Sequence, residues 1–216
     1  MRSRPRGAAL AGRIVWAMLL GAPAAVLLAP APASAQFMMG AGYKFLEAVR
    51  KRDGAEVDKA LGPTGTTTII NTQDVTSGDT ALHIVTQRRD LEWLQFLLSR
   101  GGDPNKANVK GVRPLGIAVS LNWADGVQTL LQQGARADDP GAAGETPLIA
   151  AVHQRNIELV RLLVRAGANP NRADNSGRSA RDYAALLGAD SVIASELTTA
   201  AKAAEARKAR TYGPSF

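Results

Sequence analysis

The sequence contains no cysteine, only two histidines among its 216 residues, and only 5% aromatic residues. The lack of cysteine excludes disulfide bonds and thiolate metal sites, so the folded chain must hold together by packing alone. A metal site would need His and carboxylate ligands that converge, whereas His83 and His153 fall at different points of the chain's internal pattern. We therefore expect neither a metal nor a cofactor.

Motifs of catalysis are also scarce. The sequence has no Gly-rich phosphate loop and no G-x-S-x-G phrase. Its one adjacent pair of acids, Asp138-Asp139, lies in the turn-like phrase "GARADDPG". Acids in such a turn are more often solvated turn residues than a general acid and base. We expect no enzymatic activity.

The first 35 residues have the layout of an export signal. Four arginines (Arg2, Arg4, Arg6 and Arg13) precede the apolar stretch 14–28, and the small residues Ala33-Ser34-Ala35 then predict cleavage between Ala35 and Gln36. The apolar stretch is shorter than the roughly 20 residues that span a bilayer. We expect an exported protein of the bacterial periplasm. The alternatives are an uncleaved inner-membrane anchor and, less favoured, an organelle transit peptide.

The positive net charge of +7 belongs to the ends of the chain. Without the leader and the tail, residues 36–201 carry 18 basic and 18 acidic side chains. A nucleic-acid-binding domain would show a basic face on its folded part. The neutral body therefore argues against a nucleic-acid partner.

Glycine recurs at a fixed interval through the middle of the chain. Gly78, Gly111, Gly144 and Gly177 are 33 residues apart and open the phrases "GDTALHIV", "GVRPLGIAV", "GETPLIAAV" and "GRSARDYAA". A second set, at 101, 134 and 167, has the same spacing. A repeat of this length is typical of a solenoid.

Each repeat predicts two short helices and a loop. Thr80 and Thr146 can cap a first helix, and Pro114 and Pro147 suit its first position. Second helices are predicted over 91–99, 124–132 and 157–165, each followed by a glycine that can terminate a helix. The turn phrases "GGDPN" and "GANPN" then lead into a protruding hairpin.

These phrases resemble the ankyrin repeat family, whose signature is close to G-x-T-P-L-H-x-A-A, a second helix ending L-L, and G-A-D-x-N. The resemblance covers about residues 45–193. It implies an all-α solenoid of stacked helix-turn-helix units with protruding β-hairpin loops. The middle repeat departs from the signature at Arg113, at Gly116 and in "QQGARADDP", and we expect these departures to weaken its local hydrogen bonding.

The domain boundaries follow from the period. We expect a leader at 1–35, a short linker at 36–42, an ankyrin repeat domain at 43–200 and a basic tail at 201–216. Within the domain lie a degenerate N-terminal cap (43–77), three repeats (78–110, 111–143 and 144–176) and a closing repeat (177–200). The loop after Leu61 is three residues longer than the later connections and is expected to be the least regular part. The Ala-, Lys- and Glu-rich start of the tail can extend the last helix.

The two histidines and two of the tryptophans carry individual expectations. The resemblance implies that His83 makes structural hydrogen bonds, whereas His153 lies where a side chain normally faces solvent or a partner. Trp93 is expected in the core. Trp123 has two readings of equal weight: an exposed interface anchor beside Leu121, or a side chain folded over the ends of its own helices.

The resemblance implies that the chain binds another protein through a concave face made of hairpin tips and first helices. The candidates carried over by position are Thr76, Ser77, Asp79, Gln87 and Arg88; Val109, Lys110, Val112, Ser120, Leu121 and Trp123; Ala142, Ala143, Glu145, His153 and Gln154; and Asn175, Ser176 and Arg178. This mixture suits a protein partner better than a polyanion. We expect a monomeric, non-catalytic adaptor. The alternative is a scaffold for a small molecule or an unrecognised enzyme, which would require His153, Glu145 and Arg88 to converge on one pocket.

Overall fold

The computed structural model describes residues 33–62, 67–141, 144–188 and 191–211. Most of the expected leader therefore lies outside the described residues, as do Ala142, Ala143 and the end of the chain from 212. The expected cleavage residues Ala35 and Gln36 lie in the first helix, α1 (Ala33–Lys51). Residues 36–42, expected as a linker, belong to the same helix.

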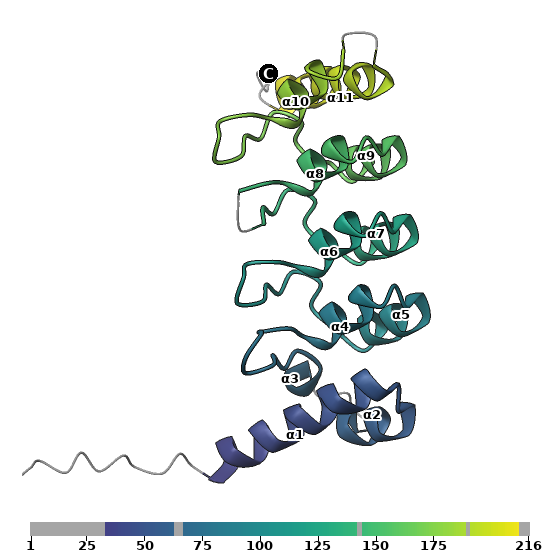
Figure 1. Cartoon of the computed structure of the whole chain (residues 1–216), viewed down its shortest axis with the longest axis vertical. Coiled ribbons are helices and arrows are strands. Elements are labelled where there is room, and N and C mark those ends of the chain that lie inside the picture. The colour runs from purple at the N-terminus through teal and green to yellow at the C-terminus, as the bar shows by residue number, and fades with distance from the viewer. Residues whose placement is uncertain (1–32, 63–66, 142–143, 189–190, 212–216) are drawn as a thin grey trace, which may run out of the picture. The chain divides into compact units, whose positions relative to one another are not determined.

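The described chain consists mainly of paired helices (Figure 1). The N-terminal cap contains α1, α2 (Gly54–Leu61) and the short α3 (Thr67–Ile70). The three repeats contain α4 (Ala81–Gln87) with α5 (Leu91–Ser99), α6 (Pro114–Ser120) with α7 (Ala124–Gln132), and α8 (Pro147–His153) with α9 (Ile157–Arg165). The closing repeat contains α10 (Ala180–Ala185) and α11 (Val192–Thr211).

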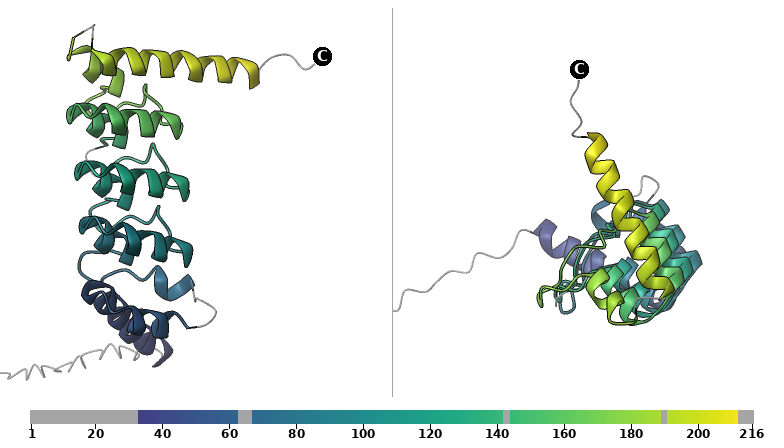
Figure 2. Two further views of the ribbon diagram at one scale, coloured as in Figure 1. Left: turned by 90° about the vertical axis from the view of Figure 1, so that its right-hand side faces the viewer. Right: turned by 90° about the horizontal axis from the view of Figure 1, so that it is seen from above.

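The pairs stack in sequence order. α4, α6, α8 and α10 each pack on the next, and α5, α7, α9 and α11 form a parallel second layer (Figure 2). The core lies between the layers, where the repeated leucines Leu82, Leu115 and Leu148 are at most 2% exposed. These observations confirm the predicted helical repeat solenoid. The loops project to one side of the first-helix layer, and the described residues contain only one isolated β-bridge, Ala173–Ser179.

The helix ends follow from local chemistry. The hydroxyl of Thr146 accepts the Ile149 N–H (3.2 Å), as predicted, and a proline occupies the first turn of α6 and of α8. The second helices α5, α7 and α9 have the predicted bounds. Each is followed by a left-handed glycine, for example Gly167 with φ 91°.

The turn inside the helix pair of each of the three full repeats also has a left-handed residue, but not a glycine. Arg89, Asn122 and Arg155 have φ values of 55°, 52° and 54° at the 33-residue spacing. This conformation costs an L-residue about 1–2 kcal/mol because Cβ approaches the following carbonyl oxygen. The turns inside the pairs therefore hold backbone strain that the packing of the two helices offsets.

Successive repeats are also joined by side chains in the turns after the second helices. Asn105 donates its amide to the Gly134 carbonyl (3.0 Å) and accepts the Arg136 N–H (2.8 Å). Asn71 donates to the Gly101 carbonyl (3.0 Å) one repeat earlier. Each of these bonds connects one repeat to the next.

The connection after Leu61 is more regular than expected, whereas the start of the tail extends the last helix as expected. The long connection after Leu61 forms α3, whose Ile70 is 1% exposed and which packs on α1; residues 63–66 lie outside the described residues. The expected tail begins inside α11, where Ala201 is 2% exposed. α3 is held by packing on α1 within the cap, and α11 packs on α9 of the third repeat.

Candidate functional site

The ends of the first helices form a row of exposed side chains. Gln87, Ser120 and His153 are the last residues of α4, α6 and α8, and all three are exposed. Since these helices pack on one another in order, the three side chains lie on successive repeats of one face. We call these three side chains, together with the loop residues Ser77, Val109, Lys110, Glu145 and Asn175, the loop–helix face.

The loop tips continue this face and are held in shape by their own side chains. Asn108 Oδ1 accepts the N–H groups of Lys110 and Val112 (both 3.0 Å). In the first tip, Asp74 accepts from Ser77 (3.1 Å) and Thr76 (2.9 Å). These bonds, together with the Arg50 guanidinium, lower the Asp74 pKa to about 2.

Neighbouring tips touch one another. The Val109 N–H donates to the Ser77 carbonyl (3.1 Å), and Val109 itself is 69% exposed. Asn175 packs its side chain against the backbone at Gly144. Gly78 has φ 71°, and a Cβ at this position would lie 2.6 Å from the Val109 nitrogen. The first tip therefore contacts the second and the third contacts the fourth, and Val109 is an apolar residue on this face.

The residues at the base of each loop face different partners. Asp79 accepts the side-chain amide of Asn108 (2.9 Å), so its carboxylate is held between two loops. Arg178 lies over the Tyr183 ring, 5.9 Å from its centroid. Val112 is half-buried. Asp79, Arg178 and Val112 were all expected to bind the partner, but only part of each side chain is available to it.

His83 is structural, as the resemblance implied. It is fully buried, its Nδ1 lies 3.1 Å from the Thr80 nitrogen, and its Nε2 lies 3.0 Å from the Val112 carbonyl oxygen. Because a backbone N–H can only donate and a carbonyl can only accept, the ring must be neutral with its proton on Nε2. Burial lowers the pKa of His83, in agreement with this neutral form.

The C-terminal end of the loop–helix face carries a connected polar cluster. His153 Nδ1 lies 2.8 Å from Glu145 Oε1, and its ring meets Tyr183 edge-on with centroids 4.4 Å apart. The Tyr183 hydroxyl donates to Asp174 (2.8 Å), and the Ser176 hydroxyl donates to the same carboxylate (2.7 Å). Donation by Ser176 and then by Tyr183 lowers the Asp174 pKa to about 2. Sequence reasoning did not identify Tyr183 or Asp174, because Tyr183 falls at a variable position of the repeated phrase and Asp174 precedes that phrase.

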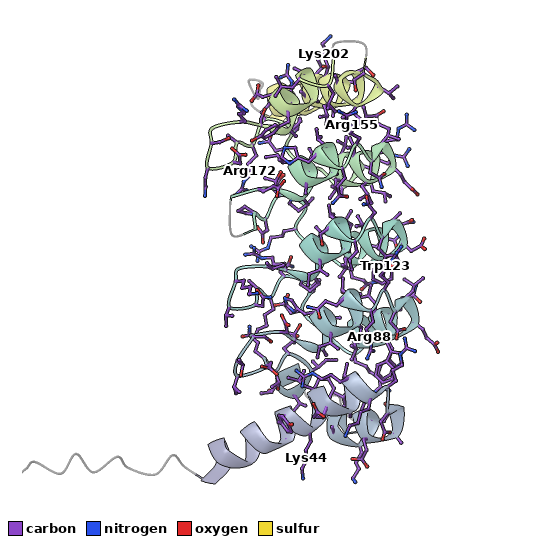
Figure 3. The ribbon with its side chains drawn as sticks, viewed as in Figure 1. Lys44, Arg88, Trp123, Arg155, Arg172 and Lys202 are labelled. Carbon is purple, nitrogen blue, oxygen red and sulfur yellow. The ribbon has the colours of Figure 1, made fainter. Side chains whose placement is uncertain are left out.

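Two candidates prove to be structural. Arg88 donates to the carbonyls of Val49 (2.8 Å) and Arg50 (3.0 Å), and so caps the C-terminus of α1. Trp123 is 5% exposed and packs against Gly126. Figure 3 shows both residues on the helix layers, away from the loop tips. The expectation of an exposed Trp123 anchor is therefore wrong, and the alternative, in which the ring folds over its own helices, is correct.

The remaining candidates differ in exposure. Leu121 is 36% exposed at the end of α6. Gln154 is half-buried, and its Oε1 atom is buried without a hydrogen bond in the described part of the chain. Lys110 and Asn175 are exposed at their tips.

The middle repeat lacks the side-chain cap that Thr146 provides for α8, as expected, because Arg113 makes no cap hydrogen bond at the start of α6. Arg113 donates to the carbonyls of Asn105 and Pro140 (both 3.1 Å) and pairs with Asp139 (3.1 Å). Its long side chain thus bonds to two carbonyl oxygens and pairs with a carboxylate instead of capping α6. Beside it, Gly116 has no side chain where the first repeat has His83, and a cavity of about 300 Å³ lies there.

The positions of His153, Glu145 and Arg88 bear on the alternative of a small-molecule site or an enzyme. His153 and Glu145 meet, but Arg88 is held on α1 in another repeat, so the three do not converge. Within the described ranges, no group of three or more His, Asp or Glu side chains could hold a metal ion. Nor does that part of the chain include a helix with the length and apolar character needed to cross a bilayer.

Comparison with known proteins gives a consistent result. A family model described as ankyrin repeats (3 copies) matches residues 45–141 and 127–195. The chain is 36% identical over 108 residues to the B-cell lymphoma 3 protein homolog of Mus musculus, covering 48% of this chain and 24% of that protein. It is 34% identical over 103 residues to the human transient receptor potential cation channel subfamily A member 1, covering 46% of this chain and 9% of the channel.

A longer match is more distant. The chain is 29% identical over 159 residues to the ADP-ribosylation factor GTPase-activating protein AGD4 of Arabidopsis thaliana. That alignment covers 70% of this chain and 20% of the plant protein. In all three comparisons the chain thus spans no more than about a quarter of the relative.

Proposed function

The chain belongs to the ankyrin repeat family, whose repeats are generally protein–protein interaction modules, and we propose that it is a non-catalytic adaptor that binds a partner protein through the loop–helix face. The observation that carries this proposal is the row formed by Gln87, Ser120 and His153. These side chains are exposed at the same position of three stacked repeats, beside loop tips held in fixed shape.

The chemistry of this face supports a protein partner. It combines an exposed apolar residue, Val109, with the neutral Gln87 and Ser120 and with the Glu145–His153 pair. Interfaces between proteins are mixed in this way, with apolar groups among hydrogen-bonding ones. A surface that bound a polyanion would instead be dominated by Lys and Arg.

The place of action is part of the proposal. The leader predicts export to the bacterial periplasm with cleavage before Gln36. Mass spectrometry of the chain purified from an exporting bacterium tests this. An N-terminus at Gln36 in the periplasmic fraction agrees with the proposal, whereas an intact N-terminus in the membrane fraction favours the inner-membrane alternative.

Matched substitutions test the binding face. We would capture partners from periplasmic extract with the wild-type chain, with Gln87→Arg/Ser120→Arg, and with Gln95→Arg/Gln128→Arg. The control positions are also exposed and have the same 33-residue spacing, but they lie on the second helices α5 and α7. We expect a protein that the wild type and the control retain and the first variant loses. Retention by all three chains would show that the partner binds elsewhere.

A further inference from the structure

The cavity beside Gly116 distinguishes the middle repeat from its neighbours. In the first repeat the same position holds His83, which fills the space between repeats and reaches the Val112 carbonyl. In the third it holds Ile149, which is fully buried. Gly116 provides no side chain, so the space between the second and third repeats is left open as a cavity of about 300 Å³. This volume is at the lower end of the range of ligand sites.

The cavity opens within the proposed binding face. Ser120 at the exposed end of α6, Val112 at the base of one loop and Glu145 at the base of the next all line it. Its inner wall is apolar and includes Leu115, Val119 and Pro147, all buried in the fold. An apolar group of a partner would therefore leave water on entering it.

Arginine provides the polar part of the lining. Arg113 and Arg136 both pair with one carboxylate, Asp139, at 3.1 and 3.2 Å. In the described part of the chain, Nη2 of Arg113 and both Nη atoms of Arg136 have no hydrogen-bond partner. The other carboxylate of the lining, Glu145, is taken up by His153 at 2.8 Å. Unused guanidinium N–H groups favour a carboxylate.

We propose that this cavity binds the C-terminal residue of the partner protein, with an apolar side chain against the inner wall and the terminal carboxylate on Arg113 and Arg136. The inference rests on the proposed function of the loop–helix face. Both kinds of lining belong to one small cavity, so one residue must provide both the apolar group and the carboxylate. In a protein chain, a residue with an apolar side chain and its own carboxylate occurs at the C-terminus.

The test uses three probes and NMR of the backbone amides of Gly116 and Thr146. The probes are acetyl-Ala-Ala-Leu with a free carboxylate, the same peptide as its amide, and 4-methylpentanoate. We expect saturable shifts with the acid, and binding about tenfold weaker with the amide, since a hydrogen bond to a charged group is lost. Equal affinity of acid and amide, or no saturable shift with any probe, would overturn the proposal. Equal affinity for 4-methylpentanoate would show a site for a small free acid instead.

Substitutions at Gly116 can block the cavity without unfolding the protein. A Cβ at this position would meet only Val112 Cγ1, at 3.9 Å, and Gly disfavours the helix in which it lies. Gly116→Leu should therefore raise the urea midpoint while it abolishes binding of the acid. Gly116→Ala is the control, which should also raise the midpoint but keep the affinity within about twofold, since it adds one methyl group. Acid binding that survives in Gly116→Leu would place the site elsewhere.

Capture of the partner protein distinguishes a failure of the cavity inference from a failure of the proposed function. A captured protein that Gly116→Leu retains and Gln87→Arg/Ser120→Arg loses would leave the loop–helix face as the binding surface and overturn the cavity inference. A protein lost by both variants, and lost again when its own C-terminus is extended by one residue, would support both.

Discussion

Stability of the protein should fall as the pH is lowered from 7.5 to 5.5 because of His83. Burial lowers its pKa below the ordinary value of 6.5, and its Nδ1 is occupied by the Thr80 N–H. In the unfolded chain the imidazole takes up a proton below about pH 6.5. The unfolded state thus binds more protons, and stability is complete above this pH and is lost as the pH falls toward the folded pKa.

Linkage sets the size of the effect. If the folded protein binds no proton at His83 between pH 7.5 and 5.5, the free energy of unfolding falls by about 1.4 kcal/mol over this interval. A folded pKa inside the interval gives a smaller loss. Asp74 and Asp174 do not contribute here, because their lowered pKa values of about 2 affect stability only as the pH falls through 3.8 toward 2.

Urea unfolding at the two pH values, followed by tryptophan fluorescence, measures this loss. The measurement belongs in a His153→Gln background, in which His83 is the only histidine. Adding His83→Gln should lower stability at both pH values and remove the pH dependence. The two proteins are compared by the stability that each loses between pH 7.5 and 5.5. An equal loss in His83→Gln/His153→Gln and in His153→Gln would refute the assignment to His83.

Three further predictions, two of them with a matched control substitution, concern the backbone and the N-terminal cap. Arg89→Gly should raise the free energy of unfolding by about 0.5–1 kcal/mol, because it relieves a left-handed φ of 55° at the cost of some chain entropy; Gln128→Gly, inside α7, should lower it by about 1 kcal/mol in the same urea assay. Gly78→Ala should cost at least about 1 kcal/mol more than Gly111→Ala, since both positions have positive φ but only the first places its methyl group against the next loop; equal costs would contradict the close approach. Arg88→Gln should destabilise the fold by about 2–3 kcal/mol and speed hydrogen exchange in α1, because two bonds from the charged Arg88 to carbonyls near the end of α1 are lost. Unchanged exchange would mean that Arg88 does not cap this helix.

The repeated part of the fold could be predicted from sequence in detail. The bounds 91–99, 124–132 and 157–165 were predicted because a glycine follows each second helix and apolar residues fix the buried side. Thr146 and the two prolines marked the starts of the first helices. Where each repeat has the same chemistry at the same place, the period specifies the backbone.

Side chains at the turns could not be predicted in this way. Arg88 and Gln154 occupy the same repeat position, but Arg88 has the end of α1 beside it and Gln154 does not. Trp123 lies at the helix start where Asp90 and Asn156 cap the neighbouring repeats, and its ring is buried instead. The contacts of each of these residues depend on the side chains of the adjoining repeat. A periodic sequence pattern does not show these differences between repeats.

The side-chain bonds between successive turns bear on how the gene can change in length. Asn105 binds Gly134 and Arg136, about one repeat ahead of it, and Asn71 binds Gly101 in the same way. Duplicating or deleting a whole 33-residue unit leaves each remaining asparagine opposite a turn of the same kind. Inserting a single codon inside a helix changes the spacing of the bonds that span the insertion and so moves their donors away from their acceptors. Evolution of this chain by whole repeats is therefore tolerated far better than evolution by small insertions within them.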